Sequence, residues 1–98
     1  MAHRFTFRPA RADDLDALTA LERRCFQSDR LSRRSFRHWI RQAHSGLILA
    51  EAEDGALAGY ALVILQRGTR LARLYSIATD PERRGQGLGE QLLDAAED

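Results

Sequence analysis

Leu74-Tyr75-Ser76-Ile77-Ala78-Thr79-Asp80-Pro81-Glu82-Arg83-Arg84-Gly85-Gln86-Gly87-Leu88-Gly89 is the stretch from which the rest of the chain can be interpreted. It begins with apolar, β-branched and aromatic residues, which are typical of a buried strand. Asp80-Pro81 ends that strand, because proline lacks a ladder donor and restricts the residue before it. Alternating glycines follow, and apolar residues then recur at helical spacing, at Leu88, Leu92 and Ala95. The stretch predicts a strand, a short basic glycine-rich turn and a helix.

The glycine-rich turn has the features of an anion site. The first N–H groups of a helix lack acceptors inside the helix, and the positive end of the helix dipole lies there. Arg83 and Arg84 stand at that end, where a cation is unfavourable by roughly 0.3–1 kcal/mol unless a phosphate or pyrophosphate accompanies it. Gly85, Gly87 and Gly89 carry no Cβ, so a ligand can approach the backbone closely. The alternative is a plain turn with solvated arginines.

The segment Arg84-Gly85-Gln86-Gly87-Leu88-Gly89 resembles the Q/R-x-x-G-x-G/A motif of the GNAT acetyltransferase superfamily, and Ile77-Ala78-Thr79-Asp80-Pro81 resembles that family's preceding strand and turn. The resemblance implies that the turn amides hold the pyrophosphate of acyl-CoA and that the strand backbone pairs with its pantetheine arm. Acetyl-CoA would be the co-substrate. The cofactor-binding residues implied in this way are Ile77, Ala78, Thr79, Arg84, Gly85, Gln86, Gly87, Leu88, Gly89 and Glu90.

Other nucleotide-binding motifs fit this turn less well. The chain has no lysine, so it cannot contain the P-loop pattern G-x-x-x-x-G-K-[ST]. Its glycines run Gly-x-Gly-x-Gly, one residue short of the dinucleotide fingerprint, and no acidic residue follows about 20 positions later.

Length and composition predict a single domain over residues 1–98. A hydrophobic content of 44% and a charged content of 30% are ordinary for a soluble globular protein. The net charge of +1 indicates no global attraction to nucleic acid or to a membrane surface. Cys25 is the one cysteine and cannot form an internal disulfide. With no apolar run of about 20 residues and no signal-peptide pattern, we expect a cytoplasmic protein.

The N-terminal third predicts a strand and a helix. Residues 4–8 alternate polar and apolar up to Pro9, which is typical of an edge strand. Ala12-Asp13-Asp14 then offers a helix cap with carboxylates in the first turn. The following apolar stripe is Leu15, Leu18, Leu21 and Cys25. We expect Cys25 to be a small core residue and not a nucleophile, because no nearby histidine supports its activation.

A second helix is predicted from Ser32, with Leu31 and Phe36 as a hydrophobic staple around the cap. Its apolar face comprises Phe36, Trp39, Ile40 and Ala43, and Gly46 is expected to end it. The opposite side is basic, with Arg33, Arg34, Arg37 and Arg41. This side is either solvated or a surface for an acidic partner or nucleic acid, the last being the weakest option. His3, His38 and His44 have no metal-ligand companions, so no metal site is predicted.

Three strands are predicted next, at Leu47–Ala52, Leu57–Gln66 and Arg70–Thr79, with a hairpin turn at Asp54-Gly55. The second is apolar on both faces and should be central in the sheet. The resulting order, β-α-α-β-β-β-α, places the chain in the α/β (α+β) class. It resembles the N-terminal half of the GNAT mixed sheet, without the C-terminal strand-helix-strand part. The resemblance therefore implies a single acyl-CoA-binding domain truncated at its C-terminus.

The resemblance implies an N-acetyltransferase that moves an acetyl group from acetyl-CoA to a primary amine, on a protein N-terminus or a small molecule. Residues 25–36 further resemble the acceptor-groove region of the ribosomal-protein alanine acetyltransferase group. In such enzymes the neutral amine attacks the thioester directly, and backbone donors stabilise the oxyanion. Tyr75 and Ser76 should lie near the cleft, but no catalytic acid or base is assigned. The alternative is a non-catalytic CoA-binding or protein-interaction module derived from a truncated GNAT domain.

The last strand also predicts self-association. If residues 71–79 form an uncovered apolar edge, that edge is a template for pairing with another chain. A two-fold homodimer built on it closes after two copies.

Overall fold

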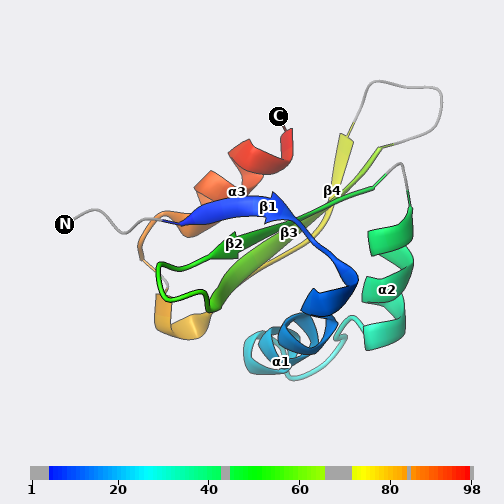
Figure 1. The fold of residues 1–98 in the computed structure, drawn as a ribbon, viewed down its shortest axis with the longest axis horizontal. Coiled ribbons are helices and arrows are strands. Elements are labelled where there is room, and N and C mark those ends of the chain that lie inside the picture. The colour runs from blue at the N-terminus through cyan, green and yellow to red at the C-terminus, as the bar shows by residue number, and fades with distance from the viewer. Residues whose placement is uncertain (1–4, 43–44, 66–71, 84, 98) are drawn as a thin grey trace.

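The computed structural model describes residues 5–42, 45–65, 72–83 and 85–97 (Figure 1). The order of strands and helices is the predicted one, with short 3-10 turns before α1 and α3. The strands are β1 (Thr6–Pro9), β2 (Ser45–Glu51), β3 (Leu57–Leu65) and β4 (Ala72–Thr79). The helices are α1 (Leu15–Cys25), α2 (Arg33–Arg41) and α3 (Leu88–Glu97), and the 3-10 turns are η1 (Ala12–Asp14) and η2 (Pro81–Arg83). None of the described helices is long and apolar enough to cross a membrane.

The strands form one sheet in the order β1-β2-β3-β4, with every neighbouring pair antiparallel. α1 and α2 cover one face and α3 covers the other, so the fold has three layers (Figure 1). β3 lies between β2 and β4, as its two apolar faces predict, and β1 is an edge strand as expected. β4 forms the opposite edge, which leaves its outer backbone groups without a neighbouring strand among the described residues.

Each face of the sheet carries its own core. The larger core lies under α1 and α2 and includes Leu18, Phe36 and Tyr60, all fully buried. The smaller lies under α3, where Leu88 and Leu92 pack on the alanines of β2 and β3. Gly59 makes this second contact possible, because a Cβ there would lie 2.7 Å from the carbonyl oxygen of Ala78 and 3.0 Å from Leu92 Cδ1. The close approach fixes α3, and with it the preceding turn, against β3.

A buried polar network crosses the larger core. Glu22 of α1 is 2% exposed, and its Oε1 accepts a hydrogen bond from the Tyr60 hydroxyl at 2.6 Å. Its Oε2 accepts one from the Leu31 N–H at 2.6 Å, and the Tyr60 hydroxyl also lies 2.9 Å from Ser76 Oγ. Burial and the hydrogen bond to Glu22 raise the pKa of Tyr60 above its ordinary value. The network connects α1, the α1–α2 connection, β3 and β4.

The cap of α2 is as predicted, because Ser32 Oγ accepts a hydrogen bond from the Ser35 N–H at 3.1 Å. The predicted end of α2 at Gly46 is wrong. The helix ends at Arg41, Gln42 is extended, and Gly46 lies in β2 opposite Val63. Pairing with β3 begins at Ser45, so the residue that the sequence predicted as a helix end is already part of the sheet. Ala43 and His44 lie outside the described residues.

Candidate functional site

The segment that joins β4 to α3 has the predicted strand-turn-helix form. Gly85 and Gly87 have φ angles of +87° and +72°, in the left-handed region that favours glycine. The Gln91 N–H donates to the Gly87 carbonyl at 3.2 Å, which is the first hydrogen bond of α3. The N–H groups of Leu88 and Gly89 precede that bond, so they have no acceptor within the helix.

A hollow of about 320 Å³ opens at this helix N-terminus. It is lined by Thr79, Arg83, Gly85, Gly87, Leu88, Gly89 and Glu90. Except for Arg83, these are residues that the motif predicted as cofactor-binding. Of the others, Ile77 and Ala78 belong to β4 and pack against the two cores, and Gln86 is half-buried in the turn. Arg84 lies outside the described residues.

The glycines of the turn leave open space where side chains would otherwise stand. A Cβ at Gly85 or Gly89 would meet no atom within 4 Å, and one at Gly87 would meet only Gln91 Nε2, at 4.0 Å. The left-handed backbone explains glycine at 85 and 87. Gly89 is a helical residue whose packing does not require the absence of a side chain. The hollow is therefore a cradle that a Cβ at position 89 would partly fill.

Asp80 anchors the turn from inside the protein. It is 4% exposed, its N–H donates to the Ala58 carbonyl at 2.8 Å, and its Oδ1 accepts from the Glu82 N–H at 3.0 Å. Its Oδ2 forms an ion pair with Arg24 of α1 and lies 3.9 Å from Arg83 Nε. Burial favours a higher pKa for Asp80, but the Glu82 N–H and the Arg24 guanidinium together hold it below the ordinary value. The sequence indicated Asp80 only as a strand end and carried no signal for Arg24.

An aromatic pair joins α2 to the middle of the exposed β4 edge. The pairing with β3 shifts between Leu62 and Val63, and Tyr75 is the extra residue of this bulge. Tyr75 is 54% exposed, and its ring centroid lies 5.8 Å from that of Trp39, which is half-buried. A strand rises about 3.3 Å per residue, so Tyr75 and Thr79 are about 13 Å apart along β4. The glycine-lined hollow thus lies at the C-terminal end of this edge strand, and the aromatic pair lies near its middle.

Cys25 has the packing expected of a core residue. It is half-buried against the larger core, and its thiol donates to the Thr79 carbonyl at 3.3 Å. Within the described parts of the chain, no group of three or more His, Cys, Asp or Glu side chains could hold a metal ion.

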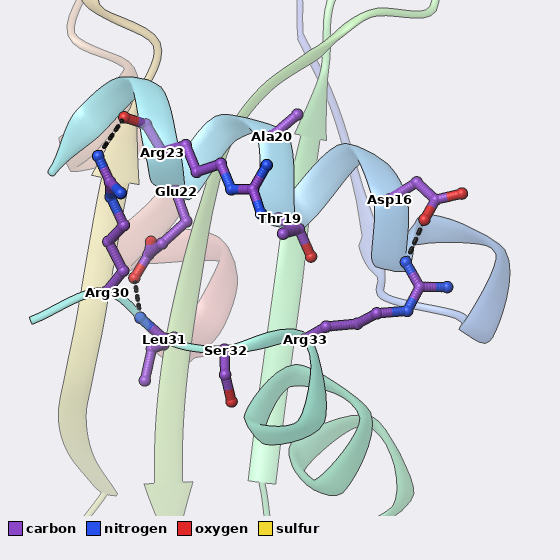
Figure 2. Close-up of a pocket in the computed structure, with 9 residues that line it drawn as sticks. All are labelled: Asp16, Thr19, Ala20, Glu22, Arg23, Arg30, Leu31, Ser32 and Arg33. Atoms are coloured by element: carbon purple, nitrogen blue, oxygen red, sulfur yellow. Dashed lines mark hydrogen bonds and ion pairs between the residues drawn. The ribbon is translucent and has the colours of Figure 1, made fainter. Parts of the chain in front are cut away.

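A second hollow, of about 630 Å³, lies between α1 and the connection to α2 (Figure 2). Its side chains make one ion pair and several hydrogen bonds to the backbone. Asp16 pairs with Arg33, Arg30 Nη2 donates to the Arg23 carbonyl at 3.3 Å, and Glu22 accepts from the Leu31 N–H (Figure 2). This arrangement holds the connection against α1. The sequence analysis missed Glu22, although an acidic residue between Leu21 and Cys25 on the apolar stripe is a signal for a buried polar contact.

The fold and the glycine turn together define the class of protein. The chain belongs to the GNAT acetyltransferase family, whose family model matches residues 15–98. A mycothiol acetyltransferase of Clavibacter sepedonicus is 35% identical over 94 residues, which cover 89% of this chain and 30% of that protein. One of Acidimicrobium ferrooxidans is 37% identical, covering 95% of this chain and 32% of that protein. The chain thus spans about a third of the length of these relatives.

Solved structures of the family share the fold. The ribosomal-protein-S18-alanine N-acetyltransferase of Escherichia coli is 25% identical, with a TM-score of 0.78 over 94% of this chain and 56% of that one. A GNAT-like decarboxylase in complex with isobutyryl-CoA is also 25% identical, with a TM-score of 0.82 over 93% of this chain and 56% of that one. The family expectation and the predicted fold class are therefore confirmed. The resemblance implied a mixed sheet, and the four described strands are all antiparallel neighbours.

Proposed function

We propose that this chain is the acyl-CoA-binding part of an N-acetyltransferase, which transfers an acetyl group from acetyl-CoA to a primary amine. The observation that carries the proposal is the glycine-lined hollow at the N-terminus of α3, in a chain of the GNAT family. The open space at Gly89 fits a bound phosphate group, because nothing in the fold itself fills it.

The chain's own groups suit the parts of such a ligand. The N–H groups of Leu88 and Gly89, with the guanidinium of Arg83, would hold the pyrophosphate, and the family motif adds Arg84 and Gln86. The outer backbone edge of β4, from Ile77 to Thr79, would pair with the pantetheine arm. Acetyl-CoA supplies the activated acyl thioester. No acid or base is assigned to the transfer.

The acceptor that we propose is a primary amine, on a protein N-terminus or a small molecule. The names of the relatives support both classes, since one group is named for mycothiol and the Escherichia coli protein for an alanine of ribosomal protein S18. A cytoplasmic location remains a prediction from the sequence.

The substitution Gly89→Ala should separate binding from folding. A Cβ at position 89 meets no protein atom, so the fold accepts it, and alanine favours a helix over glycine by up to about 1 kcal/mol. The same Cβ occupies the cradle. We therefore expect calorimetry to show CoA binding weakened about tenfold or more, while the melting temperature is unchanged or higher. Gly46→Ala is the control outside the hollow, because its backbone is not left-handed and a Cβ there would meet only the Val63 carbonyl oxygen, at 4.0 Å. Unchanged affinity in Gly89→Ala would place the ligand elsewhere.

A non-catalytic module that binds CoA or a protein partner is the second candidate. The exposed apolar side chains of β4, Leu74 at 41% and Tyr75 at 54%, favour this alternative because they offer a contact surface for a protein. A turnover assay with acetyl-CoA and a mixture of primary amines distinguishes the two. Amine-dependent release of free CoA supports the enzyme, and CoA binding without release supports the module.

The same β4 edge supports a proposed homodimer. An edge strand with exposed apolar side chains is a template for pairing with another chain. We expect light scattering to show a mass that rises toward the dimer with concentration. Tyr75→Lys should keep the chain monomeric, because a charged side chain disfavours edge pairing. Residue 71, which the prediction included, lies outside the described residues. A monomer at every concentration, with β4 amides protected from hydrogen exchange, would exclude this dimer.

A further inference from the structure

The outer face of α2 carries arginines that have no carboxylate partner among the described residues. Arg34, Arg37, His38 and Arg41 are exposed and, with Gln42, line a hollow of about 440 Å³. The helix contains no acidic residue. Among the described residues, Arg33 is the one arginine of α2 with a carboxylate partner, Asp16. We call the set Arg34, Arg37, His38 and Arg41 the α2 cationic face.

Two of these arginines, Arg34 and Arg37, destabilise α2 itself. Arg34 lies in the first turn, at the positive end of the helix dipole, where a cation is destabilising. Arg33 has the same position, but Asp16 compensates it. Arg37 and Arg41 are four residues apart, and like charges at that spacing repel each other. The dipole favours a cation only in the last turn, at Arg41. Helix formation therefore does not explain Arg34 and Arg37.

α2 contacts the middle of β4 through Trp39, which lies next to His38 of the α2 cationic face. Trp39 follows His38 on the helix, with ring centroids 4.8 Å apart, and the Trp39 ring contacts Tyr75 at the β4 bulge. A ligand that reaches His38 would therefore lie close to Trp39. The hollow in Figure 2 is lined by the carboxylates of Asp16 and Glu22 as well as by arginines, and Arg33 is already paired with Asp16, so it attracts an anion less strongly.

We propose that the α2 cationic face is a docking surface for a short acidic peptide. Guanidinium groups bind carboxylates through paired hydrogen bonds, which gives geometry as well as attraction. The face belongs to one helix of nine residues, about 14 Å long, which suits a few residues of extended peptide. Identifying this peptide with the amine acceptor rests on the proposed function.

Charge over the whole chain favours a peptide over nucleic acid. The sequence isoelectric point is about 8.0 and the net charge is +1, below the strongly basic balance of most nucleic-acid-binding domains. On the other face of the sheet, α3 exposes Glu90 and Asp94 and carries no basic residue in its last turn. A long polyanion that extended beyond α2 would find little further electrostatic attraction on the rest of the molecule.

The test uses Trp39 as a probe, because it is the chain's only tryptophan and it contacts His38 and Tyr75. The peptide Ala-Glu-Asp-Glu-Asp-Gly, with a free N-terminus, is titrated into the protein at low salt without CoA. The change in Trp39 fluorescence gives the Kd of the peptide. The matched peptide carries Gln and Asn in place of the acids and should bind at least tenfold more weakly. The double variant Arg34→Gln with Arg37→Gln should also weaken binding of the acidic peptide at least tenfold. Its melting temperature should stay the same or rise, because the unfavourable charges are removed.

Arg11→Gln with Arg23→Gln is the control, since it removes equal charge from exposed positions outside the α2 cationic face and should change the Kd less than twofold. Three results overturn the proposal: equal binding of both peptides, equal loss in both double variants, or tighter binding of a single-stranded oligonucleotide of the same charge. A CoA titration of the Arg34→Gln, Arg37→Gln variant should match the parent within twofold. Failure of peptide docking is therefore distinguishable from failure of the proposed CoA site.

Discussion

Gly87→Asp is expected to abolish CoA binding, with a loss of affinity near a thousandfold. Gly87 lines the hollow at the start of α3, where the pyrophosphate is proposed to bind. Two unit charges about 4 Å apart repel by about 4 kcal/mol at an effective dielectric constant of about 20, which corresponds to almost three decades in Kd. Calorimetry with CoA, on protein verified as folded by circular dichroism, measures the loss.

Gly87→Asn is the matched control for that charge. Gly87 has a φ of +72°, and Asn and Asp are the residues that enter the left-handed region most readily after glycine. Both variants therefore carry similar backbone strain and similar bulk, and they differ in charge. We expect Gly87→Asn to bind CoA more weakly than the parent but at least tenfold more tightly than Gly87→Asp. Equal affinity in the parent and Gly87→Asp would show that the pyrophosphate does not bind at this turn.

Glu22→Ala should destabilise the domain by about 3–5 kcal/mol. The carboxylate accepts hydrogen bonds from the Tyr60 hydroxyl and the Leu31 N–H, both at 2.6 Å. Hydrogen bonds to a charged group contribute about 1.5–3 kcal/mol each, and a buried donor left without a partner adds to the loss. Such a change is a large fraction of the 5–15 kcal/mol that stabilises a typical domain. Urea unfolding monitored by circular dichroism measures it.

Tyr60→Phe isolates one arm of the network. It removes the hydroxyl and leaves the Leu31 contact intact, so we expect a loss of about 1–3 kcal/mol. The double variant with Glu22→Ala should lose less free energy of unfolding than the two single variants lose together, because both changes break the same hydrogen bond. Full additivity, or a Glu22→Ala curve that overlays the parent, would show that the network contributes little to stability.

The sequence predicted the strand-turn-helix around the glycine turn because its signals there are local. Proline after Asp80, glycines with left-handed backbone at Gly85 and Gly87, and leucines at helical spacing act within a few residues. The two apolar faces of β3 similarly predicted its place inside the sheet. These local signals were sufficient for the order of elements, the family and the set of candidate residues.

Tertiary structure decided the contacts between residues that are far apart in the sequence. Arg24 and Asp80 are 56 positions apart, so no local pattern indicates that an arginine of α1 anchors the glycine turn. Glu22 meets Tyr60 only because α1 packs across β3. α2 ended earlier than Gly46 because pairing with β3 prevailed over a weak local stop. By itself the sequence determined the order and type of the strands and helices, because propensity and capping act within a few residues. Long-range packing determined which side chains meet and where α2 ends, because those depend on segments far apart in the chain.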